Sequence, residues 1–128
     1  MGVLRWRNVS RERSTPKLAT SKNLEAAKVA FAQGVSAARV GISVTRSSYY
    51  RTIDHNREVG GAPASQHLLG LAMDFVGRDL ERLAQRLTER GFVAIREASH
   101  LHVQAYPRDT VPEAWYVSAL GPGWRVTA

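Results

Sequence analysis

Residues 71–76 read Leu-Ala-Met-Asp-Phe-Val, and this run decides the fold class of the chain. Side chains of a β-strand alternate between its two faces, so the leucine, methionine and phenylalanine share one apolar face while Asp74 points to the other. A carboxylate beside the small Ala72 has room for a partner, and it cannot stay unpaired if it is buried. The run therefore predicts a strand with a core side and a polar side that carries chemistry.

Residues 100–104 repeat this pattern with the sequence His-Leu-His-Val-Gln. The leucine and the valine share one face of the predicted strand, whereas His100, His102 and Gln104 share the other. His67 comes shortly before the first strand, at the end of a loop that contains glycines. Two strands and one loop thus offer histidines, an aspartate and an amide to a common site.

These residue types suit a zinc ion. The chain has no cysteine, so any metal must be held by imidazole and carboxylate. Two imidazoles and one carboxylate leave a tetrahedral zinc with one open position for water, which is the pattern of a catalytic rather than a structural site. Water on such a zinc can have a pKa of about 7, which makes hydroxide available at neutral pH. The pattern therefore predicts a hydrolase with Zn2+ as its cofactor.

The rest of the chain predicts a small domain around these strands. Apolar residues recur at intervals of three and four in two segments, which indicates amphipathic helices. A polar stretch with glycines and a proline favours a long surface loop, and the chain from Pro107 onward favours an irregular end packed by its aromatic side chains. The predicted order is a helix over 23–39, a strand over 42–46, a loop over 47–66, a strand over 71–76, a helix from Leu80 closed by Gly91, and strands over 92–97 and 100–106.

This order predicts an α+β domain in which helices pack on a small, mainly antiparallel sheet. The chain has 128 residues and 44% hydrophobic content, which suffices for one modest core and not for a second domain. We expect a basic N-terminal segment over 1–22, a single domain over 23–128, and a monomer.

Positive charge is concentrated at the N-terminus. The chain carries 18 basic and 11 acidic residues, a formal charge of +7, and residues 1–22 hold six basic residues against one acidic residue, or +5 of that total. A cell wall, nucleic acid or an anionic membrane surface could each be attracted, and a solvated tail without a dedicated ligand is the alternative. The remaining +2 and the lack of a groove-reading motif argue against nucleic acid. No apolar run suits a membrane span or a secretory signal peptide, so we expect synthesis in the cytoplasm.

One segment resembles a known family. Residues 65–74 read Ser-Gln-His-Leu-Leu-Gly-Leu-Ala-Met-Asp and match every fixed position of the signature Ser-x-His-x-x-Gly-x-Ala-x-Asp. This signature is that of the zinc D-Ala-D-Ala carboxypeptidases, their dipeptidase relatives and the L-alanyl-D-glutamate endolysins of bacteriophages. Five fixed positions would match by chance in about one window in a million.

The resemblance extends to about residues 42–106. Residues 48–51 resemble the family's Ser-Gly-Tyr-Arg segment, with Tyr49 in place of the glycine, and Asn56 with residues 59–61 resembles the stretch that follows. The histidine strand is similar to the one that brings the last zinc ligand in this family and in the related hedgehog signalling domain. The resemblance therefore implies a fold of the hedgehog and DD-peptidase type.

The resemblance implies that His67, Asp74 and His102 bind the zinc. A hydrogen-bonded pair without a metal is the alternative for the first two residues. For the third ligand, His100 lies on the same face of the strand as His102. The resemblance favours His102, which leaves His100 to hydrogen-bond the substrate or the transition state.

Four further residues receive roles. Glu97 precedes the histidine strand and could act as the general base, although an exposed glutamate at a hairpin end is the alternative. Arg51 could bind a substrate carboxylate or the developing oxyanion, because a guanidinium offers paired donors in fixed geometry, or it could be an ordinary surface arginine. Ser65 and Gln104 could orient the substrate or a ligand imidazole.

The expected function is hydrolysis of a peptide bond in the stem peptide of bacterial peptidoglycan. The bond could be that of a D-Ala-D-Ala carboxypeptidase or the L-Ala-D-Glu link cut by an endolysin. A basic segment without a signal peptide fits a bacteriophage endolysin that reaches the cell wall through another protein, and a bacterial carboxypeptidase acting in the periplasm fits nearly as well. The alternative is a zinc-binding interaction module that has kept the fold and lost the reaction.

Overall fold

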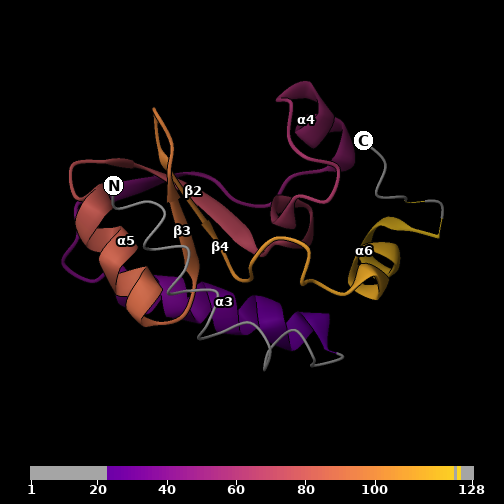
Figure 1. Ribbon diagram of the computed structural model, residues 1–128, viewed down its shortest axis with the longest axis horizontal. Coiled ribbons are helices and arrows are strands. Elements are labelled where there is room, and N and C mark those ends of the chain that lie inside the picture. Colours follow the sequence, from indigo (N-terminus) through magenta and orange to yellow (C-terminus); the bar gives the residue numbers. More distant parts are fainter. Residues whose placement is uncertain (1–22, 123, 125–128) are drawn as a thin grey trace.

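The computed structural model describes residues 23–122 and 124, and the predicted basic segment over 1–22 lies outside the described residues. A single antiparallel sheet with the strand order β1-β2-β4-β3 occupies the centre of the described chain (Figure 1). The α+β class with a small antiparallel sheet is therefore confirmed. The strands are β1 (Val44–Ser48), β2 (Ala72–Gly77), β3 (Val93–Arg96) and β4 (Leu101–Gln104).

Helices α3 (Leu24–Ala38) and α5 (Leu80–Glu89) lie on the same side of the sheet (Figure 1). The side chain of Asn23 caps α3 by accepting a hydrogen bond of 3.0 Å from a backbone N–H of its first turn. Phe31 of α3 packs edge-to-face on Phe92, which follows α5, with 5.4 Å between ring centroids. The two predicted helices thus cover one face of the sheet, and their buried side chains form part of the hydrophobic core. No helix among the described residues is long and apolar enough to cross a membrane.

Strand pairing separates an apolar face from a polar face. Met73 lies opposite Val103 in the register of β2 and β4, and both residues are buried in the core. One position further along β2, Asp74 lies opposite His102. Because neighbouring positions of a strand point to opposite faces, this pair lies on the face away from α3 and α5. The alternation predicted from the sequence is confirmed.

Three short helices form where we predicted a loop or irregular chain. Helix α4 (Ile53–Glu58) and the 3-10 helix η1 (Gln66–Leu69) interrupt the predicted loop, and α6 (Glu113–Leu120) lies in the predicted irregular end. Such short helices hold too few apolar residues for a period to stand out. Other contacts stabilise these helices: Thr52 accepts a hydrogen bond that caps α4, and Trp115 of α6 is buried in the core.

The first strand also begins later than predicted, at Val44 instead of Ile42. The backbone N–H of Ser43 donates to the carboxylate of Asp79 at 2.8 Å, and the carbonyl of Ser43 accepts from the backbone N–H of Asp79 at 3.2 Å. Residue 43 is therefore held by the connection between β2 and α5 and not by a neighbouring strand.

Candidate metal centre

Three residues predicted to bind metal lie together on the polar face of the sheet. Asp74 comes from β2, His102 from β4, and His67 from η1, which leads into β2. Gly70 ends η1 in a left-handed conformation, with φ 73° and ψ 27°, which turns the chain sharply into the strand. One potential ligand atom from each of the three residues lies within 4.8 Å of the other two.

Asp74 is the centre of this cluster. Its Oδ1 lies 3.0 Å from His102 Nδ1 and 3.4 Å from His67 Nε2, and the residue is only 6% exposed. Burial acts to raise the pKa of Asp74, but the imidazoles of His102 and His67 outweigh it and hold the pKa well below its usual range. Asp74 is therefore ionised in the folded protein and offers an anionic oxygen to a cation.

The main chain orients the imidazole of His67. Its Nδ1 lies 2.5 Å from the carbonyl oxygen of Tyr49, which can only accept a hydrogen bond, so Nδ1 is the donor. Its Nε2 is buried near Asp74 and has no hydrogen-bond partner among the described residues. In the neutral ring this nitrogen carries a lone pair. An unpaired acceptor of this kind, with a second imidazole and a carboxylate beside it, fits a zinc site.

Arg51 reaches the same carboxylate from its other oxygen. Its Nη2 lies 3.3 Å from Asp74 Oδ2, and its Nη1 donates to Asn56 Oδ1 at 3.1 Å. Asn56 is 4% exposed, and its Nδ2 donates to the carbonyl oxygen of Ala62 at 2.9 Å. The sequence suggested Arg51 but assigned Asn56 no chemical role. The buried amide of Asn56 thus holds the guanidinium of Arg51 beside the cluster of His67, Asp74 and His102.

His100 lies at the edge of the cluster. Its Nε2 is 3.9 Å from Asp74 Oδ1, compared with 3.0 Å for His102 Nδ1. His100 belongs to the connection between β3 and β4, whereas His102 lies within β4. These distances favour His102 as the third ligand and place His100 where it could contact a bound substrate.

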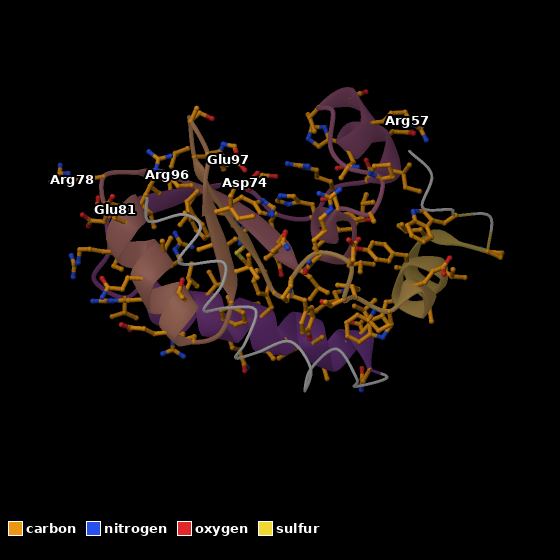
Figure 2. All side chains as sticks on the ribbon, in the orientation of Figure 1. Arg57, Asp74, Arg78, Glu81, Arg96 and Glu97 are labelled. Atoms are coloured by element: carbon orange, nitrogen blue, oxygen red, sulfur yellow. The ribbon has the colours of Figure 1, made fainter. Side chains whose placement is uncertain are left out.

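Glu97 begins the tight connection between β3 and β4. Its backbone N–H donates to the carbonyl of His100 at 2.8 Å, which continues the register in which Ile95 lies opposite His102. Alternation along the strand therefore gives Glu97 the same face as His100 and His102. Figure 2 shows Glu97 and Asp74 near each other in this view. The glutamate is exposed, and no hydrogen bond among the described residues joins its carboxylate to the metal cluster.

Ser65 and Gln104 both contact predicted metal ligands. Ser65 Oγ accepts a hydrogen bond from the backbone N–H of His67 at 3.1 Å and so caps η1. Gln104 Oε1 lies 2.8 Å from Nε2 of His102. Their predicted contact with a substrate stays a prediction. The structure adds the Tyr49 carbonyl, a main-chain group whose role no residue type could signal.

An imidazole and a carboxylate on the antiparallel sheet, a second imidazole from η1 and an arginine beside them form the donor set of a metal-dependent hydrolase. A family model described as Peptidase M15 matches residues 8–104. This match covers 97 of the 128 residues, counted as 104 − 8 + 1, and the chain therefore belongs to the peptidase M15 family of zinc-dependent peptidases. No match to a curated protein or to a solved structure was found.

Proposed function

We propose that this chain is a zinc peptidase that hydrolyses a bond in the stem peptide of bacterial peptidoglycan. His67, Asp74 and His102 bind the ion. The convergence of these three side chains within 4.8 Å, in a chain of the M15 family, is the observation that carries the proposal. The peptidoglycan substrate is supported by the signature over residues 65–74, which is typical of enzymes that act next to D-alanine or at the L-Ala-D-Glu link.

A zinc ion in this site supplies a Lewis acid that activates water and polarises the carbonyl of the scissile bond. Glu97 accepts a proton from the attacking water and passes it to the nitrogen of the departing amine, as the C–N bond breaks. Arg51 and His100 donate hydrogen bonds to the oxygen on which negative charge develops. Both flank Asp74, at 3.3 Å and 3.9 Å from its carboxylate oxygens.

The protein acts on the cell wall after synthesis in the cytoplasm, either during release of a bacteriophage or in the periplasm. The formal charge of +5 on residues 1–22 supports attraction to an anionic wall by long-range electrostatics. We propose a monomer that engages the stem peptide without nucleic acid.

The direct test incubates the purified protein with peptidoglycan fragments, with and without a chelator, and identifies the products by mass spectrometry. Loss of a terminal D-alanine assigns a carboxypeptidase, and two peptides separated at L-Ala-D-Glu assign an endopeptidase. Zinc bound at one ion per chain without any cleavage would refute the enzyme and support an inert zinc-binding module instead.

Glu97→Gln isolates the proton transfer from the metal. The amide keeps the size of the side chain but cannot accept the proton, so kcat should fall about a hundredfold to ten-thousandfold while zinc content stays unchanged. Glu81→Gln is the matched control, because Glu81 is an exposed glutamate of α5, which packs on the opposite face of the sheet. A Glu97→Gln enzyme that cuts at the parental rate would remove this residue from the mechanism.

A further inference from the structure

The ring of His102 can offer Nδ1 to a metal only if the hydrogen of the neutral imidazole resides on Nε2. Nδ1 is the nitrogen that faces Asp74, at 3.0 Å. Nε2 lies 2.8 Å from Oε1 of Gln104. An amide oxygen accepts and cannot donate, so this contact needs a hydrogen on Nε2. The ionised carboxylate of Asp74 accepts as well, so its contact needs a hydrogen on Nδ1 in the metal-free ring, and a metal on Nδ1 would take the place of that hydrogen.

The direction of the Gln104 amide is itself fixed. An amide could turn over and present its NH2 group to the imidazole, which would favour the opposite tautomer. Gln104 Nε2, however, donates to the main-chain carbonyl of Tyr106 at 2.7 Å. Because that carbonyl can only accept, the NH2 group must face Tyr106 and the oxygen must face His102.

A second glutamine holds the same carbonyl in place. Gln66 Nε2 donates to the Tyr106 carbonyl at 2.7 Å, and Gln66 Oε1 accepts from the Tyr106 backbone N–H at 3.2 Å. Gln66 is 5% exposed and directly precedes His67 in η1. The Tyr106 carbonyl thus accepts from two amides, one reaching from each ligand-bearing element, so the segments that carry His67 and His102 are tied together.

We infer that Gln104 is a positioning residue that holds the hydrogen of His102 on Nε2 when Nδ1 releases its own, and so presents Nδ1 to the metal. Tyr49 does the same for His67 with a main-chain carbonyl, which leaves Nε2 of that ring facing Asp74. The two imidazoles therefore face one carboxylate through opposite nitrogens, each set by an acceptor on the far side of the ring. This inference rests on the proposed assignment of His102 as a zinc ligand.

The test compares Gln104→Met, which keeps the length and removes both amide contacts, with Gln104→Glu, which keeps an oxygen acceptor for Nε2–H. Gln85→Met is the matched control, because Gln85 is an exposed glutamine of α5. The hydrogen positions are read from ¹⁵N-edited NMR spectra of the imidazoles in zinc-loaded protein. Zinc affinity is measured by competition with a chelator.

In the zinc-loaded parental protein, His102 should carry its hydrogen on Nε2 and bind zinc through Nδ1, and Gln104→Met should give a mixture of tautomers. Zinc affinity should fall about tenfold to a hundredfold in that variant, as expected for loss of a group that orients a metal-bound histidine. Gln104→Glu should keep the parental tautomer and recover most of the affinity. His67 should keep its hydrogen on Nδ1 in every variant and serves as an internal control.

Two outcomes would overturn the inference. One is a Gln104→Met protein with the parental tautomer and parental affinity. The other is an equal loss in Gln104→Met and Gln104→Glu, which would assign the effect to packing and not to the acceptor. If Gln104→Met fails to fold, the tautomer of His102 in the parental protein and in Gln104→Glu decides. If the parental protein binds no zinc, the proposed function fails and this inference fails with it. Zinc binding by the parental protein with no change in Gln104→Met overturns the inference alone.

Discussion

Gly61→Ala tests how Arg51 is held beside the cluster of His67, Asp74 and His102. A Cβ at Gly61 would lie 2.0 Å from Asn56 Oδ1 and 2.9 Å from Arg51 Nη1. Ordinary contact begins at 3.4 Å, so the Asn56 oxygen must move by about 3.4 − 2.0, or 1.4 Å. That oxygen accepts the hydrogen bond from Arg51 Nη1 at 3.1 Å, and the added methyl group therefore breaks the anchor of the guanidinium.

The size of the effect follows from these contacts. A hydrogen bond to a charged group contributes about 1.5–3 kcal/mol, and displacement of a site group by about 1 Å can slow a reaction about a hundredfold. We therefore expect kcat/KM on a stem-peptide fragment to fall about tenfold to a hundredfold. Zinc should remain bound, because none of the three proposed ligands is touched.

Gly60→Ala is the neighbouring control. Gly60 has φ +75°, and nothing lies within 4 Å of a Cβ built there. Alanine at that position should cost about 1–2 kcal/mol of stability through backbone strain alone, measured by urea unfolding, and should leave kcat/KM unchanged. A Gly61→Ala protein with parental activity, or an equal loss of activity in both variants, would refute the proposed coupling of Gly61 to Arg51.

Two further predictions concern the histidines and the buried tyrosines. His102→Ala should lose zinc in metal analysis, whereas His100→Ala should keep zinc and lose rate; the reverse would exchange their roles. Tyr116→Phe should lower the free energy of unfolding by about 1 kcal/mol, because the Tyr116 hydroxyl donates to the carbonyl of Ala64 at 2.6 Å. Tyr106→Phe should be neutral or stabilising, because the buried Tyr106 hydroxyl has no partner among the described residues. Burial raises the pKa of Tyr106 from 10.0 to about 12, so the unfolded chain releases this proton at a lower pH than the folded protein does. The free energy of unfolding should therefore fall as the pH rises from 10 toward 12, and it should fall less steeply in Tyr106→Phe. Equal unfolding curves for Tyr116→Phe and Tyr106→Phe would refute the contrast between the two hydroxyls.

The strands and the convergence of Asp74 and His102 could be predicted because their signal is local. Alternation over residues 71–76 and 100–104 places Asp74 and His102 on one face without any knowledge of the partner strand. The register that sets Asp74 opposite His102 depends on how the two strands pair, and the alternation within each strand does not predict it. Once the strands pair as neighbours, their polar side chains lie on the same face of the sheet. The alternation of polar and apolar residues in the sequence and the strand pairing in the fold therefore bring together the same two residues, Asp74 and His102.

The short helices and the groups that support the ligands could not be predicted, for a different physical reason. Helix α4 (Ile53–Glu58) is held by its cap and by the packing of Asn56, which contacts Arg51 and the carbonyl of Ala62. These contacts depend on the folded path of the loop. Likewise, the acceptor for His67 is a carbonyl of Tyr49, which every residue type would supply at that position.

The two oxygens of Asp74 have different partners, and this division gives Arg51 a role before any substrate arrives. Imidazole nitrogens surround Oδ1, and Arg51 Nη2 lies 3.3 Å from Oδ2. With a guanidinium on Oδ2, Oδ1 is the oxygen of Asp74 that would hold a metal, beside the two imidazoles. Each Nη of Arg51 carries two hydrogens and uses one of them on Asn56 or Asp74. The same side chain can therefore orient the ligand and still donate to the oxygen of a substrate, which is why the anchor at Gly61 should affect the rate more than the affinity for zinc.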